Sequence, residues 1–209
     1  MTLDVPFVDF DAQDLDTALE LHGARFDVNR VNWPAEWPYA PLCSGRIARS
    51  EDALVVDFRV SGLDLRALNL QDNGRQWEDS CVEVFIQNPE SPEYYNFEIN
   101  ALGKVLACRG VAREGRTVRP AEEMEQIVRF ASFEGPQDYE GGLWTWRVVV
   151  LIPFELIGAD PENLPRSIRA NFYKCGDKTA HPHFVTWSPV DTPRPDFHRP
   201  EFFGTLNLR

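Results

Sequence analysis

The chain has 209 residues, 43% of them hydrophobic, and a formal net charge of −12 at pH 7. This hydrophobic content is enough for a packed core and excludes a disordered tail, while the acidic balance argues against nucleic acids and anionic membranes as partners. No window approaches the ~20 apolar residues of a membrane-spanning helix. We therefore expect one folded domain over residues 1–209, a length that β-sandwiches often reach without dividing.

The N-terminal residues and the cysteines indicate where the protein works. Residues 1–6 contain no basic segment and no long apolar run, so they lack the pattern of a signal peptide and we expect a cytoplasmic location. The cysteines, Cys43, Cys81, Cys108 and Cys175, are far apart in the sequence and form no Cys-x-x-Cys motif. This spacing is typical of reduced thiols rather than of a zinc site or a disulfide framework.

Near the N-terminus lies the one convincing helix of the chain. It is predicted over residues 11–22, because Leu15, Ala18 and Leu19 share a face and Gly23 follows as a stop signal. A loop rich in proline and aromatic residues follows at 34–41. The strands predicted in this part of the chain cover residues 5–10, 46–50 and 54–60.

The remainder of the chain consists of short strands without a strand–helix–strand rhythm. Residues 113–125 are charged and predicted as a loop, and 190–200 as a rigid loop with three prolines. This pattern predicts an all-β fold, an antiparallel β-sandwich of jelly-roll or immunoglobulin-like type with one short N-terminal helix. Besides the hairpin described next, strands are predicted at 103–109, 144–152, 168–174, 184–187 and 202–208, and 126–133 fits either a strand or a short helix.

A hairpin over residues 77–100 carries the candidate functional side chains. Both of its strands alternate with period two, and a turn with two prolines separates them at 88–93. If the hairpin closes symmetrically, Glu83 faces Glu98. The residues predicted on this polar face are Cys81, Glu83 and Phe85 of the first strand and Asn96, Glu98 and Asn100 of the second.

Two facing acids need a chemical reason, because directly opposed residues lie about 5 Å apart and like charges there are unfavourable. A cation, a shared proton, an arginine or a hydroxyl-rich ligand would each supply one. Trp77 precedes the first strand and places a flat ring at the rim of this face. Rings beside carboxylates and carboxamides suit a sugar, which stacks its C–H faces and both donates and accepts hydrogen bonds. The alternative is a solvated outer face on which water screens the acids.

Other interpretations use the two acids or ionisable side chains elsewhere in the chain. Glu83 and Glu98 could act as the two carboxyls of a retaining glycoside hydrolase, which lie about 5–5.5 Å apart, or could hold a calcium ion with carbonyl oxygens. His181 and His183 alternate as two metal ligands would on a strand, but no third ligand is evident and the intervening proline favours loop histidines. Arg147, on the outward side of its strand, could supply positive charge near Glu98.

The order of motifs resembles a known family. The segment Trp77-Glu-Asp-Ser-Cys-Val-Glu83, the Asn-Phe-Glu-Ile-Asn strand at 96–100 and the Phe-Phe-Gly-x-Leu ending at 202–206 are similar to a family 9 carbohydrate-binding module and to the wider DOMON-like superfamily. The resemblance covers residues 46–208 and extends to an uncharacterised bacterial subgroup. It implies a β-sandwich that binds the end of a glucan chain between two aromatic rings. It also implies an extracellular or periplasmic location.

Carried over by position, the resemblance assigns roles to single residues. Trp77 matches the first stacking ring and Phe197 the second, Glu83 matches a carboxylate that binds sugar hydroxyls, and Asn100 matches a carboxamide ligand. Asn96 stands at a position where the family has a longer amide side chain. Glu98 departs from the family pattern, in which an arginine is expected at this position. The sugar specificity of the family therefore does not carry over to this protein.

The sequence thus predicts non-catalytic binding of a mono- or oligosaccharide, with no catalytic residue and no dedicated metal. The predicted ligand-binding residues are Trp77, Glu83, Asn96, Glu98, Asn100 and Phe197. A glycoside hydrolase that uses Glu83 and Glu98, and a protein-interaction module that uses the aromatic loops, are the alternatives.

Overall fold

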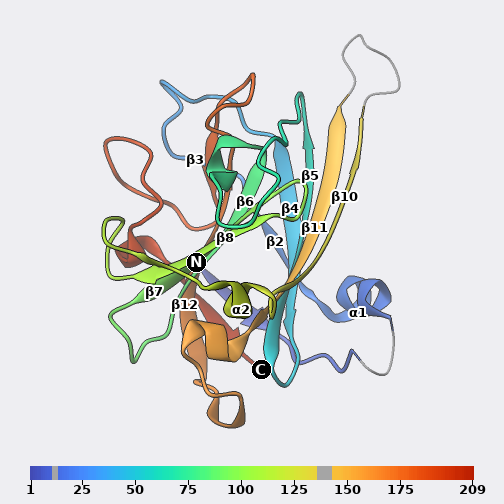
Figure 1. Ribbon diagram of the computed structural model, residues 1–209, viewed down its shortest axis with the longest axis vertical. Helices are drawn as coiled ribbons and strands as arrows, with labels where there is room; N and C mark the ends of the chain where they lie inside the picture. Colours follow the sequence, from blue (N-terminus) through green and yellow to red (C-terminus); the bar gives the residue numbers. More distant parts are fainter. Residues whose placement is uncertain (11–13, 136–142) are drawn as a thin grey trace.

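Two β-sheets packed face to face form the body of the protein in a computed structural model that describes residues 1–10, 14–135 and 143–209 (Figure 1). The predicted all-β sandwich is confirmed. Neighbouring strands are antiparallel except for the first and last strands of the chain, which pair in parallel. Both ends of the chain therefore lie at one edge of the larger sheet.

The larger sheet has nine strands among the described residues, and it contains both strands of the candidate hairpin. Two short strands extend it beyond β12, because β13 pairs with the C-terminal half of β12 and β3 pairs with β13. The main order is β1 (Thr2–Val5), β14 (Gly204–Leu208), β12 (Ser167–Cys175), β6 (Cys81–Gln87), β7 (Tyr94–Asn100), β8 (Val105–Gly110) and β9 (Thr117–Val118), with β13 (Phe184–Thr186) and β3 (Arg30–Val31) at the side.

The smaller sheet has five strands in the described part of the chain. In order they are β10 (Val128–Glu134), β11 (Trp144–Pro153), β5 (Ala53–Gly62), β4 (Leu42–Arg49) and β2 (Ala24–Asp27). The segment that the sequence left open between strand and helix is thus the edge strand β10. Asp57 of β5 lies on the outer face of this sheet and is buried there, where Arg59 and Arg147 pair with it.

Helices are few and short. The predicted N-terminal helix is present as α1 (Leu15–His22), with Asp14 as its N-cap, and residues 11–13 of the prediction lie outside the described residues. Its buried residues Ala18 and Leu19 pack on the outer face of the smaller sheet. The predicted loop at 113–125 contains β9 and the short helix α2 (Ala121–Met124). Single 3₁₀ turns occur at η1 (Gln76–Glu78), η2 (Phe154–Ile157), η3 (Pro161–Asn163) and η4 (Pro200–Phe202).

The main core fills the space between the sheets. It follows from the period-two alternation, because every second residue of β5, β6 and β7 points inward. Phe26 of β2 stacks on Phe172 of β12 with ring centroids 4.4 Å apart, which joins the two sheets directly. Burying one such side chain contributes about 1.5–3 kcal/mol. Fully buried members from the central strands include Val56, Phe58, Val84, Ile86, Phe97 and Ile99.

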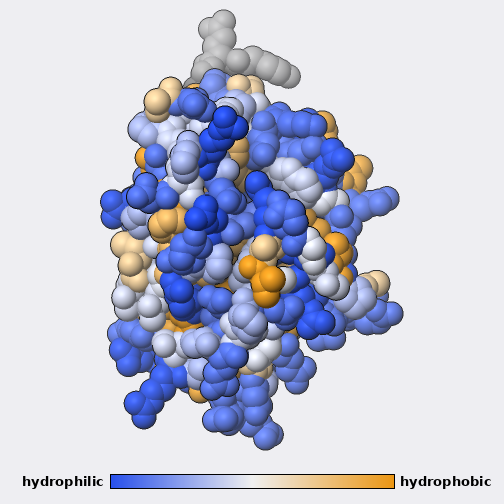
Figure 2. All heavy atoms as spheres, turned by 90° about the vertical axis from the view of Figure 1, so that its left-hand side faces the viewer, coloured by the Kyte–Doolittle hydropathy of each residue, from blue (hydrophilic) through white to orange (hydrophobic). Residues whose placement is uncertain are grey.

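A second apolar layer covers the opposite face of the larger sheet. Phe85, Tyr94 and Tyr173 point away from the main core and are packed under Trp33, Phe197 and Phe203, which come from loops. The strands β6 and β7 are therefore buried on both faces, and the predicted polar face is roofed rather than open to solvent. From outside, this side of the molecule is largely hydrophilic, with small apolar areas between polar ones (Figure 2). No helix within the described ranges is long and apolar enough to cross a bilayer.

Candidate ligand-binding site

The hairpin of β6 and β7 closes in the predicted register. Glu83 is the direct partner of Glu98, Phe85 of Asn96, and Cys81 of Asn100. Symmetric closure of the turn at residues 88–93 gives this register, and it places Val84 and Phe97 opposite each other on the side of the main core. The sequence did not reveal the strand on the other side of β6, which is β12.

A cavity of about 270 Å³ opens above this part of the sheet. Its size is near the lower limit for small-molecule sites. Four of the six predicted site residues line it, namely Trp77, Glu83, Glu98 and Phe197, whereas Asn96 and Asn100 do not. The remaining lining residues are Arg113, Arg116, Cys175, Asp177, Phe184, Pro195 and His198.

Two aromatic rings from distant parts of the chain wall the cavity. Trp77 lies half-buried in η1, and its carbonyl oxygen accepts a hydrogen bond from the backbone N–H of Asp177 at 3.0 Å. Phe197 stacks one face of its ring on Tyr173, with centroids 4.1 Å apart and planes 9° apart. The Tyr173 hydroxyl also donates to the Phe197 carbonyl oxygen at 3.0 Å. The ring of Phe197 and the backbone of Trp77 are thus held in place by contacts within the protein.

The two facing acids form the polar floor of the cavity, and each is only 3% exposed. Burial raises the pKa of Glu83 well above its usual range, and the nearby charge of Glu98 adds to the shift. Burial also raises the pKa of Glu98, to about 7, against the opposing effect of a nearby arginine. Two buried carboxyls this close favour a form in which at least one carries a proton, so the floor can both donate and accept hydrogen bonds.

Hydrogen bonds within the protein leave part of this floor unsatisfied. Asn96 donates its amide N–H to Glu98 Oε1 at 3.0 Å, and the Cys175 thiol donates to Glu83 Oε1 at 3.0 Å. The buried Oε2 of Glu98 and Oδ1 of Asn96 have no partner among the described residues. Buried polar atoms are rarely left unpaired, and such atoms beside a cavity are typical of a site that a polar ligand completes.

The positive charge near Glu98 comes from Arg116, not from Arg147. Nη1 of Arg116 lies 3.6 Å from Glu98 Oε1. The suggestion that Arg147 has this role was wrong, because Arg147 lies on β11 in the other sheet and pairs with Asp57 and Asp16 at 2.8 and 2.7 Å. Arg116 belongs to a charged loop after β8, and nothing in its local pattern indicated that the loop folds back over the hairpin.

His198 is a further lining residue that the sequence left without a role. Its Nδ1 lies 2.9 Å from the hydroxyl of Tyr94, a fully buried residue of β7. Burial lowers the pKa of His198 to about 2, and the charges of Arg116 and Arg113 act in the same direction. The imidazole is therefore neutral at physiological pH, with one nitrogen engaged by Tyr94.

Asn100 is structural rather than part of the cavity. Its amide nitrogen donates to the Asn69 carbonyl oxygen at 2.9 Å and to Asp79 Oδ2 at 3.0 Å. Its amide oxygen accepts from the backbone N–H groups of Leu102 and Lys104 at 3.1 and 3.0 Å. Every hydrogen-bonding position of this side chain is occupied, so it has none to offer to a ligand.

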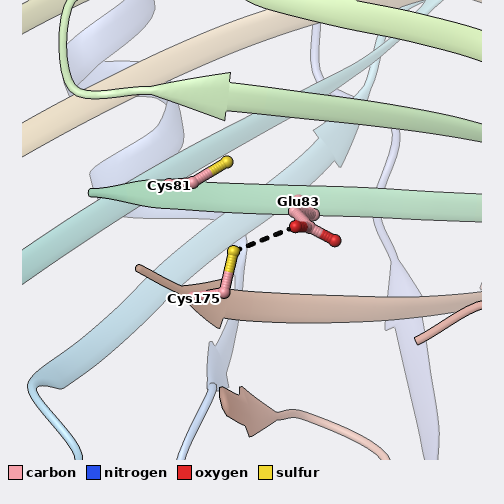
Figure 3. Close-up of side chains that lie close together, drawn as sticks. All are labelled: Cys81, Glu83 and Cys175. Carbon is pink, nitrogen blue, oxygen red and sulfur yellow. Dashed lines mark hydrogen bonds between the residues drawn. The ribbon is translucent and has the colours of Figure 1, made fainter. Parts of the chain in front are cut away.

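His181 and His183 belong to no group of three metal-type side chains in the described part of the chain. Nε2 of His183 lies 2.7 Å from the buried Lys174 Nζ, and the backbone N–H of His181 donates to Asp64. Glu98 belongs to no group of three His, Cys, Asp or Glu ligand atoms there, and a calcium site that also uses carbonyl oxygens stays a hypothesis. Such a group does form from Cys81, Glu83 and Cys175 (Figure 3).

Comparison with known proteins identifies the fold and the family. The family model described as "Carbohydrate-binding family 9" matches residues 13–208, which confirms the resemblance predicted from the motifs. No protein of curated function matches the chain. The broader DOMON-like relationship stays a prediction.

Among the solved structures that match this chain, the following are similar over its whole length. One, a candidate carbohydrate-binding protein from Bacteroides uniformis, is 32% identical with a TM-score of 0.87, over 100% of this chain and 99% of that one. The others are family 9 carbohydrate-binding modules from Caldicellulosiruptor kristjanssonii. One, in complex with glucose, is 12% identical with a TM-score of 0.61, over 100% of this chain and 96% of its own. The other, in complex with cellotriose, is 10% identical with a TM-score of 0.58, and the match covers 100% of this chain and 94% of that one.

Proposed function

The chain belongs to carbohydrate-binding family 9, and on this premise we propose that it binds a sugar, without catalysis, in the cavity beside Trp77. The observation that carries the proposal is the arrangement of two aromatic rings, Trp77 and Phe197, around a floor made by Glu83 and Glu98. Neither feature alone would indicate a sugar, but together they match its two kinds of surface.

The chemistry of each wall supports this ligand class. Sugar rings present C–H groups on their faces, and these pack on flat aromatic rings such as Trp77. Sugar hydroxyls both donate and accept hydrogen bonds. Two glutamates of raised pKa offer both kinds of partner, and the unpaired Oε2 of Glu98 is ready to accept one.

Gluco-configured sugars are the first ligands to test. Two solved modules of the same family are in complex with glucose and with cellotriose. The volume of about 270 Å³ favours one sugar unit inside the cavity, with any further units of an oligosaccharide outside it.

Binding is favoured over hydrolysis because the family model describes carbohydrate binding. Arg116 also lies beside Glu98, where it favours the ionised form and opposes a role as proton donor. A hydrolase would release product from aryl glycosides, and we expect none.

Titration calorimetry with glucose, cellotriose and a panel of other sugars tests the proposal. We expect saturable binding that Trp77→Ala weakens by at least about 2 kcal/mol, or roughly 30-fold, as for a central aromatic anchor. Trp144→Ala is the matched control, since Trp144 is also half-buried but lies on β11 and lines no part of this cavity. Unchanged affinity of Trp77→Ala, with both variants folded, would remove Trp77 from the site.

A further inference from the structure

Two cysteines that are 94 positions apart in the sequence meet beside one of the site acids. Cys81 on β6 and Cys175 on β12 are direct cross-strand partners, and Glu83 lies two residues after Cys81 on the same face of β6. The two Sγ atoms and a carboxylate oxygen of Glu83 all lie within 4.8 Å of one another. Figure 3 shows the three side chains on the two neighbouring strands, with the Cys175 sulfur directed toward Glu83.

We propose that Cys81, Glu83 and Cys175 bind a thiophilic divalent cation of the Zn²⁺ type at the floor of the cavity. Thiolate sulfur and carboxylate oxygen are both common Zn²⁺ ligands, at about 2.3 and 2.0–2.2 Å. Atoms within 4.8 Å of one another reach such distances from a common centre with small side-chain shifts. Cys81 and Cys175 are too far apart in the sequence to form a zinc motif, but the pairing of β6 with β12 brings them together.

The three ligands leave a fourth position that faces the cavity. Glu83 and Cys175 both line the cavity, which supplies an entry path, whereas Cys81 lies behind them and is fully buried. A tetrahedral ion with three protein ligands keeps one site for water or for an oxygen of another ligand. Binding forms two metal–sulfur bonds and one metal–oxygen bond, and the two thiol protons pass to solvent, together with the proton of Glu83 when that carboxyl is protonated.

The thiols lack other strong partners, which is consistent with this role. Within the described residues, the Cys81 thiol donates a long hydrogen bond to the carbonyl oxygen of Val82, its neighbour in the chain, at 3.5 Å, and it interacts with the Cys175 thiol. Cys175 donates to Glu83 at 3.0 Å, so the contact that a metal would replace already joins two of the ligands. Sulfur ligands select Zn²⁺ over Ca²⁺, which prefers six to eight oxygens.

Metal binding is measured on the full chain, reduced and free of chelator, with Zn²⁺ alone as the probe and no sugar present. A chromophoric chelator in competition gives stoichiometry and affinity, and Co²⁺ substitution gives a thiolate-to-metal absorption band. We expect one ion per chain. Cys81→Ser, Cys175→Ser and Glu83→Gln should each weaken binding by at least about 100-fold, since even outer-sphere substitutions cost 10–100-fold.

Cys43→Ser is the control, because Cys43 is also buried but lies on β4 in the other sheet. It should bind Zn²⁺ like the unsubstituted protein. The proposal is overturned if the reduced chain binds no Zn²⁺ at a ratio of one, or if folded Cys81→Ser and Cys175→Ser keep full affinity. It is also overturned if mild oxidation links the two cysteines while the reduced form binds no metal. This assay contains no sugar, and sugar binding is measured separately on metal-free protein, so either proposal can fail without the other.

Discussion

Glu83 of β6 and Glu98 of β7 face each other as a direct cross-strand pair, each 3% exposed, at the floor of a cavity. Facing acids weaken strand pairing in water, and burial adds the cost of removing their charges from solvent. The Arg116 guanidinium, 3.6 Å from Glu98, offsets this cost only in part. Such an arrangement lowers stability and is typical of a site kept for binding rather than for folding.

The first prediction follows from this pair. Glu98→Gln removes one of the two facing acids and keeps an oxygen that can accept from Asn96. The free energy of unfolding at pH 8 should rise by about 1 kcal/mol, while sugar affinity should fall by roughly 10-fold as one hydrogen-bond partner is lost. Denaturant unfolding and calorimetry measure the two effects. Glu90→Gln, in the exposed turn after β6, should change neither, and a destabilised Glu98→Gln would contradict the account of the pair.

Asn100 should contribute to the stability of the protein and not to its affinity for sugar. Its side chain makes four hydrogen bonds that join β7 to two loops, and it is fully buried. Asn100→Ala should therefore destabilise the protein by about 2–4 kcal/mol, because several buried groups lose their partners. Sugar affinity of the molecules that remain folded should be unchanged. A large loss of affinity without loss of stability would return Asn100 to the binding residues, as the family resemblance implied.

A third prediction concerns the hydrogen bond between Tyr94 and His198. The Tyr94 hydroxyl holds Nδ1 of the ring at 2.9 Å, and the other ring nitrogen is then available to the cavity that His198 lines. Tyr94→Phe should weaken sugar binding several-fold, or by about 1 kcal/mol, because the ring loses its fixed orientation. Tyr95→Phe is the matched control, since Tyr95 is the next residue of β7 and points into the main core. Equal affinities of the two variants would exclude a positioning role.

The fourth prediction concerns pH and the buried His183. Its Nδ1 lies 2.7 Å from the His181 carbonyl oxygen and its Nε2 2.7 Å from Lys174 Nζ. Burial, together with the charge of Lys174, lowers the pKa of His183 to about 2. The unfolded chain binds a proton here below about pH 6.5 and the folded chain does not, so stability is lost as pH falls through that value, by about 1.4 kcal/mol per pH unit.

His183→Gln removes this contribution, so its free energy of unfolding should change less than that of the unsubstituted protein between pH 7.5 and 5.5. Between these two pH values, the unsubstituted protein should lose about 1.4 kcal/mol more of its free energy of unfolding than His183→Gln does. Urea unfolding at both pH values measures it, and comparison of variants cancels the opposite trend of the buried glutamates. His22→Gln, at an exposed position at the end of α1, should follow the unsubstituted protein. If the unsubstituted protein, His183→Gln and His22→Gln all show parallel pH profiles, unfolding does not change the protonation of His183.

Local patterns in the sequence were sufficient for most of the longer strands and for the hairpin register, but not for the short strands β2, β3 and β9, and the first strand is Thr2–Val5 rather than 5–10. Alternation with period two fixes which side of a strand is apolar, and a short turn fixes which residues face each other. Glu83 and Glu98 are therefore found opposite each other, as predicted. The family motifs added Phe197, which shares the cavity with Trp77 although the two are far apart in the chain.

Only the tertiary structure decided what surrounds that hairpin. Which strand pairs with the free side of β6, and which loops fold over its polar face, depend on contacts between distant segments that no local period encodes. Hence Arg116 rather than Arg147 lies beside Glu98, and Cys175 meets Cys81. The local alternation placed Asn100 correctly on its face, but the hydrogen bonds that occupy it come from backbone groups whose positions are set by folding. The sequence by itself thus determined the fold class, the family and the polar face, whereas long-range packing turned that face into a cavity walled by distant loops and lined by their charges.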